Sequence, residues 1–525
     1  MVPPVPSVPP VLPDVPDADA VTALRDDLEA ASYRVDAADA LLGPVAVAAL
    51  HREQSLPAQR VLDALGGHDG YGGSPLAVLI DLFLLARPVR RGLVDAALPR
   101  CGTAGLQALG LVSAAGAGAA DPVRAVVDVR PYAAQTPDGS HDWWLVSDLG
   151  EVSTGAPLRP DHVLGIGPAG TTLAQATIRR PVARVLDLGT GSGLQALHAR
   201  THASHVVGTD VSRRALAMAR LTLALSAVQA VELRHGNLFD PVAGERFDQV
   251  ASNPPFVITP RLAGVPAFEY RDGGLTGHEV VRRLVTGVGA HLEPGGVAQL
   301  LGNWEVGRDG GWTDVVGAWV DASGLDAWVV QRDVQDPAEY AELWARDGSQ
   351  PAGTQRDRLY RAWLDDFERR GVEEVGFGVV TLRRPGPGTV ALRRLESCSG
   401  PVRAHLGAHL DRCLAAHDRT AGLDDRALLD LSPVVAPDVT EERHHRPGEE
   451  DPAVVLLRQG DGFARTVQVG TATAAAVGAC DGELTLGRIT GALAVLLERP
   501  VGEVETEVVP GVRALIADGL LLPGA

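Results

Sequence analysis

Hydrophobic and polar positions follow a helical period in the first part of the chain and later change to strand-like alternation. From Ala18 to about Leu65 the period is helical, and DADAVTALRDDLEAA has a capped amphipathic start. SPLAVLIDLFLLA predicts a buried helix, PVRRGLVDAALP and GLQALGLVSA predict two shorter ones, and VRAVVDVRPYA and WWLVSDLG predict strands. This order predicts an α+β domain of winged-helix type over residues 18–155. The Pro-rich residues 1–17 are expected to be disordered.

Strand-like and helical stretches alternate between residues 156 and 390. The strand-like ones are VARVLDLG, SHVVGTD, AVELRHGN, FDQVASN, GGVAQLLGNW, DAWVVQRDV and GFGVVTLRR. Such alternation predicts an α/β domain with a doubly wound, mainly parallel sheet. Residues 391–450, which include RHHRPGEEDP, are expected to form a linker. Residues 451–525 begin with a probable hairpin that turns at Asp461-Gly462, and three helical stretches follow, so a small winged-helix-like α+β module is expected there.

Charge limits the classes of binding partner. The formal net charge is −19, and all 47 basic residues are arginine. A protein that holds long nucleic acid needs a basic face, because phosphate contacts supply most of that affinity. A protein or small-molecule substrate is therefore favoured over a duplex. A local patch around Arg90, Arg91 and Arg124 leaves structured RNA open as an alternative.

Cysteine usage and the absence of membrane signals bear on the compartment. The four cysteines are scattered without a CxxC pair, which is typical of free thiols in a reducing compartment and indicates no metal site. The amino terminus has no basic lead and no continuous apolar core, so it does not resemble a signal peptide. No uncharged apolar run reaches the length of a membrane span. We expect a cytoplasmic protein that does not bind membranes.

A glycine loop follows the first predicted strand of the α/β domain, in VARVLDLGTGSGLQALHA. Gly189, Gly191 and Gly193 lie between an apolar strand and a helix. Glycines let the backbone pass close under a ligand, and the start of a helix offers unpaired N–H groups. The spacing is GxGxG with Leu194 after it, so the dinucleotide fingerprint GxGxxG is not met.

The next three predicted strands also end in polar signals. The second ends at Asp210, where a carboxylate can accept both ribose hydroxyls of a nucleoside, although an N-cap for the following helix is an alternative. The third ends in Asn237-Leu238-Phe239, and the fourth runs into SNPPF. A rigid loop after a core strand is the alternative interpretation of Asn-Pro-Pro. Ligands of such sheets bind at the carboxyl ends of the strands, where all four signals meet.

With VLDLGTGSG and SNPPF together, residues 160–385 resemble the class I S-adenosyl-L-methionine-dependent methyltransferases of the "small domain" group. That group methylates planar nitrogens through an NPPY or NPPF motif. It includes release-factor glutamine methyltransferases, ribosomal-RNA guanine N2-methyltransferases and DNA adenine N6-methyltransferases. The resemblance implies a Rossmann-like fold and S-adenosyl-L-methionine (SAM) as the cofactor.

The resemblance also implies roles for single residues. Gly189, Thr190, Gly191 and Gly193 would hold the methionine moiety of SAM, and Asp187 would brace their loop. The ribose hydroxyls would bind Asp210, and the adenine would pack on Val211, with its edge at Asn237 and Leu238. Most relatives have Asp in place of Asn237, whose amide oxygen can still accept the adenine amino hydrogen. Upstream, GPAGTTLAQAT resembles the segment that covers the cofactor, with Thr171 and Thr172 in it.

The Asn-Pro-Pro-Phe motif suits methyl transfer to a planar nitrogen because it can orient the lone pair of that nitrogen. The lone pair of an amide nitrogen is delocalised, so the enzyme must mainly position that nitrogen against the methyl group. If Asn253 Oδ1 and the Pro254 carbonyl each accept one N–H, the lone pair is directed at the methyl carbon. Pro255 makes the carbonyl rigid, and the Phe256 ring can stack on the planar group.

The identity of the acceptor nitrogen stays open at this stage. Gly273, Gly274 and Gly277 resemble a glycine stretch of the release-factor enzymes, although a helix start capped by Thr276 is an alternative. A protein glutamine, as in a translation release factor, is the main hypothesis. Methylation of a ribosomal or transfer RNA base at guanine N2 or adenine N6 is the first alternative. A winged-helix regulator that binds SAM without catalysis is the second.

Overall fold

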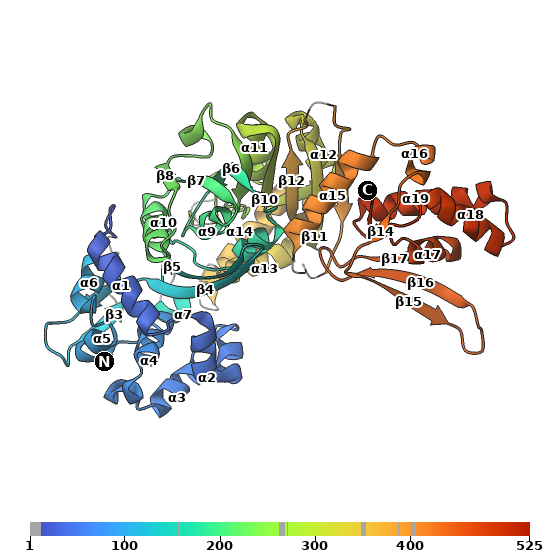
Figure 1. The fold of residues 1–525 in the computed structure, drawn as a ribbon. Coiled ribbons are helices and arrows are strands. Elements are labelled where there is room, and N and C mark those ends of the chain that lie inside the picture. The colour runs from blue at the N-terminus through green and yellow to red at the C-terminus, as the bar shows by residue number, and fades with distance from the viewer. Residues whose placement is uncertain are drawn as a thin grey trace.

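The computed structural model describes residues 12–155, 158–261, 268–269, 271–347, 353–386, 388–400, 403 and 405–524. An N-terminal unit, a central α/β domain and a C-terminal module follow one another along the molecule (Figure 1). Part of the predicted disordered lead, residues 1–11, lies outside the described residues. The rest of it is ordered: Leu12 is buried in the first hydrophobic core, and Asp17 caps the first helix through the N–H groups of Asp19 and Ala20.

The N-terminal unit begins with helices and contains most of its strands in its second half, although β1 precedes α5 and α6. The elements are α1 (Ala18–Ala30), α2 (Val35–Leu50), α3 (Leu56–Ala64), η1 (Gly67–Asp69), η2 (Tyr71–Gly73), α4 (Pro75–Leu79), η3 (Ile80–Leu84), β1 (Val89–Arg90), α5 (Arg91–Ala97), α6 (Gly102–Ala108), β2 (Val112–Ala114), β3 (Pro122–Ala125), β4 (Asp128–Thr136), β5 (Gly139–Ser147) and α7 (Glu151–Thr154). One antiparallel sheet has the order β1-β3-β2, and β4 and β5 form a separate hairpin. The winged-helix type of this unit stays a prediction.

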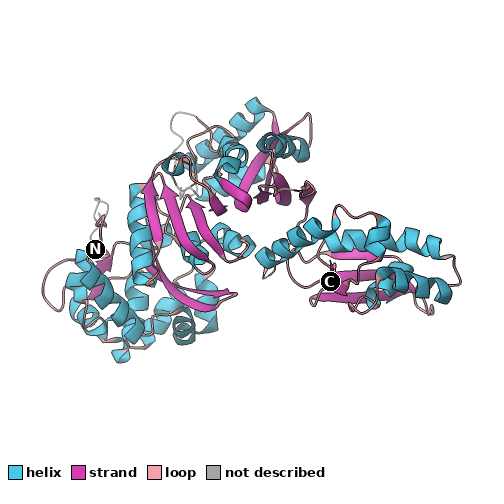
Figure 2. Cartoon of the chain, turned by 45° about the horizontal axis from the view of Figure 1, so that its top comes forward, coloured by secondary structure: helices cyan, strands magenta, loops and turns pink. Residues whose placement is uncertain are grey.

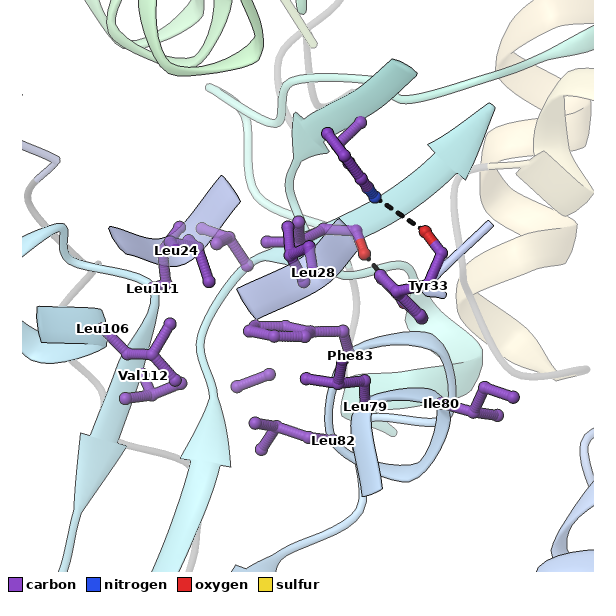
Figure 3. Close-up of a cluster of buried hydrophobic side chains, with 14 of the residues drawn as sticks. Leu24, Leu28, Tyr33, Leu79, Ile80, Leu82, Phe83, Leu106, Leu111 and Val112 are labelled. Atoms are coloured by element: carbon purple, nitrogen blue, oxygen red, sulfur yellow. Dashed lines mark hydrogen bonds between the residues drawn. The ribbon is translucent and has the colours of Figure 1, made fainter. Parts of the chain in front are cut away.

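A single hydrophobic core joins the N-terminal unit to the central domain. Leu24, Leu28 and Phe83 are fully buried in it, and Tyr33 spans it by donating its hydroxyl to Val129 O and accepting from Trp144 Nε1 through its own carbonyl (Figure 3). The same core includes buried residues of α10 (Arg213–Leu225) in the central domain. Two backbone N–H groups of β5 also donate to this helix and its cap: Val146 N to Thr222 Oγ1 in α10, and Trp144 N to Oγ of the C-cap residue Ser226. The two units are therefore fixed to each other along α10.

The central domain is built on one eight-stranded sheet with helices on both faces (Figure 2). Besides α10, its elements are α8 (Pro168–Ala176), β6 (Val182–Leu188), α9 (Leu194–Arg200), β7 (Ala203–Asp210), β8 (Val231–His235), η4 (Asp240–Val242), β9 (Phe247–Ser252), α11 (Glu279–Gly287), η5 (Val288–His291), β10 (Leu292–Gly307), α12 (Trp312–Ser323), β11 (Asp326–Gln335), α13 (Pro337–Asp347), α14 (Thr354–Arg370) and β12 (Val372–Arg383). Helices α11 and α12 pack on one face of the sheet, and α8 and α9 on the other.

The order of strands in this sheet is β13-β11-β12-β10-β9-β6-β7-β8. Neighbours are parallel except that β12 runs antiparallel to both β10 and β11. The chain builds β6, β7 and β8 outward in one direction and then returns to place β9 on the other side of β6. The predicted doubly wound, mainly parallel sheet is confirmed. Its reversal of direction between β6 and β9 opens the crevice in which such sheets bind ligands.

The predicted linker at residues 391–450 is corrected by the structure. It contains β13 (Arg393–Ser397), α15 (Leu406–Thr420), α16 (Asp425–Leu429), β14 (Val434–Val435) and β15 (Val439–His445). Strand β13 adds an edge to the central sheet, parallel to β11, and α15 buries Leu406, Leu410 and Leu414 in the same core as α8. Strands β13 and β15 each lie at the edge of a sheet, where charged residues are common. Neither therefore shows the alternation that marks a half-buried strand.

The C-terminal module contains the predicted hairpin and three helices. Its elements are β16 (Pro452–Gln459), β17 (Thr466–Val469), α17 (Thr471–Gly478), α18 (Leu486–Leu496), α19 (Val501–Ala517) and β18 (Leu521–Leu522). Strands β16 and β17 are antiparallel, but the connection runs from Gly460 to Arg465 and is longer than a two-residue turn at Asp461-Gly462. Strand β15 pairs with β16 as a third strand, so the module begins before residue 451. Over the described part of the chain, every helix is too short or too polar to span a membrane.

Candidate functional site

A cavity of about 510 Å³ lies at the carboxyl ends of the strands, in the crevice between β6 and β9. Ten of the fourteen predicted site residues line it: Gly189, Thr190, Gly191, Asp210, Val211, Asn237, Leu238, Asn253, Pro254 and Pro255. They come from the ends of four strands that are separated in sequence. The fold therefore brings the four polar signals of the sequence to one place.

The glycine loop has a backbone that only glycine adopts without strain. Gly189, Gly191 and Gly193 have φ angles of 78°, 56° and 91°, in the left-handed region. A Cβ added to Gly189 or Gly191 would meet no heavy atom within 4 Å, so the backbone there faces open space. Gly193 precedes α9 and packs against Ala219 instead; it does not line the cavity.

Asp187 supports the glycine loop from beneath and does not line the cavity. It is 1% exposed, and its Oδ2 accepts from Thr190 Oγ1 at 2.6 Å. Its Oδ1 has no hydrogen-bond partner among the described residues. Burial, with the charge of Asp210 as a smaller cause, raises the pKa of Asp187 from 3.8 to about 7. Its predicted role, bracing the loop under a cofactor, stays a prediction.

Asp210 ties the glycine loop to the start of α10. Its Oδ2 accepts from Gly191 N at 2.9 Å, and its Oδ1 accepts from Ser212 N at 2.8 Å. The N-cap of α10 is Ser212, whose hydroxyl accepts from Ala215 N, so the N-cap alternative for Asp210 is wrong. Burial raises the pKa of Asp210, although the two amide bonds oppose this. Next to it, the apolar side chain of Val211 is 58% exposed, which gives the cavity a flat hydrophobic wall.

The third strand end is held against the second. Gly236 N donates to Asp210 O at 3.0 Å, so Asn237 and Leu238 lie beside Asp210 in the lining of the cavity. Leu238 has a φ of 45°, an uncommon conformation for a residue with a side chain. The surrounding structure thus forces this residue into a strained position at the edge of the cavity.

Asn253 follows directly after β9 and carries an unused acceptor. Ser252 Oγ donates to Leu188 O at 2.8 Å and so fixes the end of β9 against β6. Asn253 Oδ1 is buried and has no hydrogen-bond partner among the described residues. The Pro254 carbonyl likewise accepts no hydrogen bond from the described part of the chain. Buried acceptors without partners are rare in folded proteins and call for an explanation.

Phe256 lies away from the cavity wall. Its ring packs on hydrophobic residues of the central sheet, and its backbone forms a bridge with Asp272. Its predicted stacking role stays a prediction.

Thr172 in α8 does not line the cavity either, whereas its neighbours Gly167 and Gly170 do.

The loop after the NPPF motif closes the other side of the cavity. Gly273 and Gly274 line it, and a Cβ on Gly273 would lie 2.3 Å from Val280 Cγ2, so only glycine fits between the loop and α11. Gly274 N donates to Asp272 Oδ1 at 2.9 Å. The N-cap position of α11 is His278, so Thr276 does not occupy the cap that the sequence suggested.

Some lining residues carry no sequence signal of their own. The segment from His162 to Gly165, Ser212, Glu269 and Arg283 all line the cavity. Segment 162–165 is held by Val163 N, which donates to Asp148 Oδ2 at 2.9 Å, and Glu269 N donates to Pro160 O at 2.8 Å. These contacts join parts of the chain that are distant in sequence, and no short motif marks them.

The charge of the cavity wall is negative. The lining residues include Asp210, Glu269 and Asp272 against one arginine, Arg283, whose Nε donates to Glu279 Oε1 at 2.8 Å. Arg261 pairs with Asp272. Within the described ranges, no group of His, Cys, Asp and Glu side chains could hold a metal ion.

A wider, more open hollow of about 870 Å³ lies at the opposite, amino-terminal ends of β6 and β7. It is lined by Arg179, Arg200 and His202, among others, and by none of the predicted site residues. Arg179 donates to Ala174 O at 2.7 Å and Arg200 to Gln229 O at 2.8 Å, so main-chain carbonyls already engage both arginines. The smaller cavity, where the predicted residues meet, is the candidate functional site.

Three parts of the chain are similar to known protein families. Residues 168–316 match the methyltransferase small domain, and residues 30–125 and 410–523 match two domains of unknown function. A ribosomal protein uL3 glutamine methyltransferase of Bradyrhizobium diazoefficiens is 32% identical over 34% of this chain and 59% of its own length. A release factor glutamine methyltransferase of Cereibacter sphaeroides is 36% identical over 30% of this chain and 58% of its own length. The chain thus spans less than two thirds of the relatives it matches.

Solved structures were matched as well. The T. thermophilus 16S rRNA N2 G1207 methyltransferase in complex with AdoMet and guanosine matches with 15% identity and a TM-score of 0.26, over 56% of this chain and 68% of its own. A methyltransferase from Pyrococcus furiosus matches with 18% identity and a TM-score of 0.26, over 42% of this chain and 85% of its own.

Proposed function

We propose that this chain is a SAM-dependent N-methyltransferase whose acceptor is the side-chain amide of a protein glutamine, since residues 168–316 match the methyltransferase small domain. The observation that carries the proposal is that Asn253 and Pro254 line the same cavity as the glycine loop, while Asn253 Oδ1 and the Pro254 carbonyl have no hydrogen-bond partner among the described residues. An amide NH₂ group has two N–H donors, one for each of these oxygens.

The described residues fit SAM. The glycine loop offers backbone that faces open space, and the Asp210 carboxylate keeps lone pairs for two ribose hydroxyls beside its two amide bonds. The exposed side chain of Val211 offers an apolar surface for the adenine, and Asn237 offers an amide at its edge. When bound, the cofactor supplies a methyl group activated on a sulfonium. Asp187 and Thr190 would keep the loop rigid beneath it.

The chain's own residues then orient the acceptor. Asn253 Oδ1 and the Pro254 carbonyl each accept one N–H of the planar nitrogen, which leaves its lone pair directed at the methyl carbon. A bound cofactor would supply the methyl group from its sulfonium, and the extra proton of the methylated nitrogen would pass to solvent, so the site needs no strong base. The two prolines limit the backbone rotations that would let the carbonyl turn away.

The charge of the site supports a protein amide over RNA. The cavity wall carries three carboxylates, of which Asp272 pairs with Arg261, and one arginine, which pairs with Glu279. No unpaired arginine among the described lining residues is therefore left to attract the phosphates of a nucleic acid. The N-terminal unit, which the alternative hypothesis would use to bind RNA, gives that alternative little support: Arg91 pairs with Asp95, and α6 contains no basic residue. The relatives named for release factor and uL3 glutamine methylation support the same acceptor class.

The test uses purified protein and tritiated SAM with four acceptors in separate tubes: a translation release factor, ribosomal protein uL3, total RNA and DNA. We expect label in a protein tube with the wild type and none with Asn253→Ala. Thr259→Ala is the matched control, because its buried hydroxyl has no partner among the described residues and lies outside the cavity. Label in RNA would support base methylation instead. SAM binding without label in any tube would support the non-catalytic regulator.

A further inference from the structure

A pair of helices that contains no predicted site residue lies against residues 254–258, which follow Asn253 and are called the acceptor loop below. Helices α13 and α14 are inserted between β11 and β12. Their buried residues Tyr340, Trp363 and Phe367 form a hydrophobic cluster with Ile258, which follows the NPPF motif by two residues. Ile258 is 1% exposed, so its peptide groups are removed from water.

Two side chains of this insertion hold the backbone of Ile258. The Tyr340 hydroxyl accepts from Ile258 N at 2.8 Å, and Trp363 Nε1 donates to Ile258 O at 2.8 Å. Both side chains are buried, at 0% and 1% exposure. A buried peptide group without partners is strongly unfavourable, so these two bonds favour this one position of Ile258.

Further hydrogen bonds connect Tyr340 to the sheet and the acceptor loop to Arg271. Asn303 of β10 donates through Nδ2 to the same Tyr340 hydroxyl at 2.9 Å, which fixes the hydroxyl relative to the sheet. On the other side of the loop, Val257 N donates to Arg271 O at 2.8 Å. Only Phe256 and the two prolines separate these anchors from Asn253, and the prolines restrict rotation between them.

The insertion itself is fixed to the sheet. At the end of α14, Arg370 pairs with Glu305 of β10 and with Asp366, and these three side chains are largely buried. Glu305 N donates to His278 Nδ1 at 3.0 Å, which ties the same point to the start of α11. These contacts attach the end of the insertion to the sheet and to α11.

We propose that α13 and α14 form a positioning element for the acceptor loop, in which Tyr340 and Trp363 are positioning residues. Through Ile258 they hold Asn253 and the Pro254 carbonyl at the separation that two N–H donors of one nitrogen require. The inference rests on the proposed function for its catalytic consequence. Its structural part, restraint of the loop by these two side chains, can be measured without any acceptor.

The test compares Tyr340→Phe with Tyr360→Phe. Both tyrosines lie on the insertion, but the Tyr360 hydroxyl has no hydrogen-bond partner among the described residues, so its removal controls for the loss of an oxygen. In hydrogen–deuterium exchange, we expect the peptide that contains Ile258 to exchange about tenfold faster in Tyr340→Phe and at the wild-type rate in Tyr360→Phe.

Catalysis supplies the second readout. With the release factor or uL3 as acceptor, Tyr340→Phe should lower kcat about tenfold while the Kd for SAM stays within about twofold of wild type. A loss that is only structural would lower the Tm and weaken SAM binding as well. Trp363→Phe should behave as Tyr340→Phe does, and Trp344→Phe is its control, because Trp344 Nε1 has no partner in the described part of the chain.

The outcomes separate the two proposals. Unchanged exchange at Ile258 in Tyr340→Phe and Trp363→Phe overturns the positioning role, whatever the catalytic result. Faster exchange with unchanged kcat also overturns it. A wild type that methylates none of the acceptors contradicts the proposed function, while the exchange experiment still decides whether the insertion restrains the loop.

Discussion

The two walls of the cavity are built in different ways. The cofactor wall consists of the glycine loop, Asp210 and Asn237, each fixed by hydrogen bonds to its immediate neighbours at the ends of β6, β7 and β8. The acceptor wall consists of Asn253 and the loop after it, fixed by side chains that lie 82 and 105 residues further along the chain. Hydrogen bonds between neighbouring strand ends make the first wall, and side chains of an inserted helix pair hold the second. Binding and transfer should therefore respond separately to mutation.

The largest effect should come from Asn253→Ala. Loss of one of the two oxygens that orient the nitrogen should lower kcat/KM about 1,000-fold, as loss of a preorganised polar group in an active site does. The Kd for SAM, measured by calorimetry, should stay within about threefold, because no bond of the cofactor wall involves Asn253. If SAM binding fell as much as turnover, the two walls would not be separable.

Asp210→Ala should produce the opposite pattern. It removes a buried carboxylate that organises Gly191 and Ser212 and would accept the ribose hydroxyls, so we expect the Kd for SAM to rise about 100-fold. At saturating SAM, kcat should fall by less than about tenfold. Asp240→Ala is a suitable control, since Asp240 is an exposed acid outside the cavity wall. Unchanged SAM affinity in Asp210→Ala would contradict the assignment of the cofactor wall.

The pKa of Asp187 makes the stability of the cofactor wall depend on pH. Its folded pKa of about 7 lies above the ordinary value of 3.8, so the folded state binds more protons between these values. Its contribution to stability is therefore greatest at low pH and falls as the pH rises from about 4 through 7. We expect Asp187→Asn to reduce the loss of Tm that the wild type shows between about pH 5 and about pH 8. Equal pH dependence in both proteins would show that Asp187 titrates normally.

Phe256→Leu should have the smallest effect. The Phe256 ring packs on the core of the sheet and lies outside the cavity wall, so an aliphatic side chain should preserve most of its contacts. We expect kcat/KM to change less than about threefold. A much larger loss, with SAM affinity unchanged, would show that the ring stacks on the acceptor after a rearrangement of the loop. That result would make the acceptor wall more mobile than the contacts of Ile258 indicate.

The sequence alone indicated which strand ends supply residues to the cavity. Glycines 189 and 191, Asp210 and Asn253 could be placed because each follows an apolar strand, and the carboxyl ends of parallel strands meet at one edge of a sheet. The same alternation of strands and helices gave the doubly wound order. These features depend on residues close in sequence, so short patterns carry them.

Only the tertiary structure decided the rest. The expected linker contains β13 and α15, because an edge strand and a helix take their partners from distant elements. Thr172 lies outside the cavity wall while segment 162–165 lines it, and Tyr340 and Trp363 reach Ile258 across the fold. The raised pKa of Asp187 likewise comes from burial, which the chain acquires only when distant parts cover that residue. Contacts between residues far apart in sequence leave no local pattern, so folding alone brings them together.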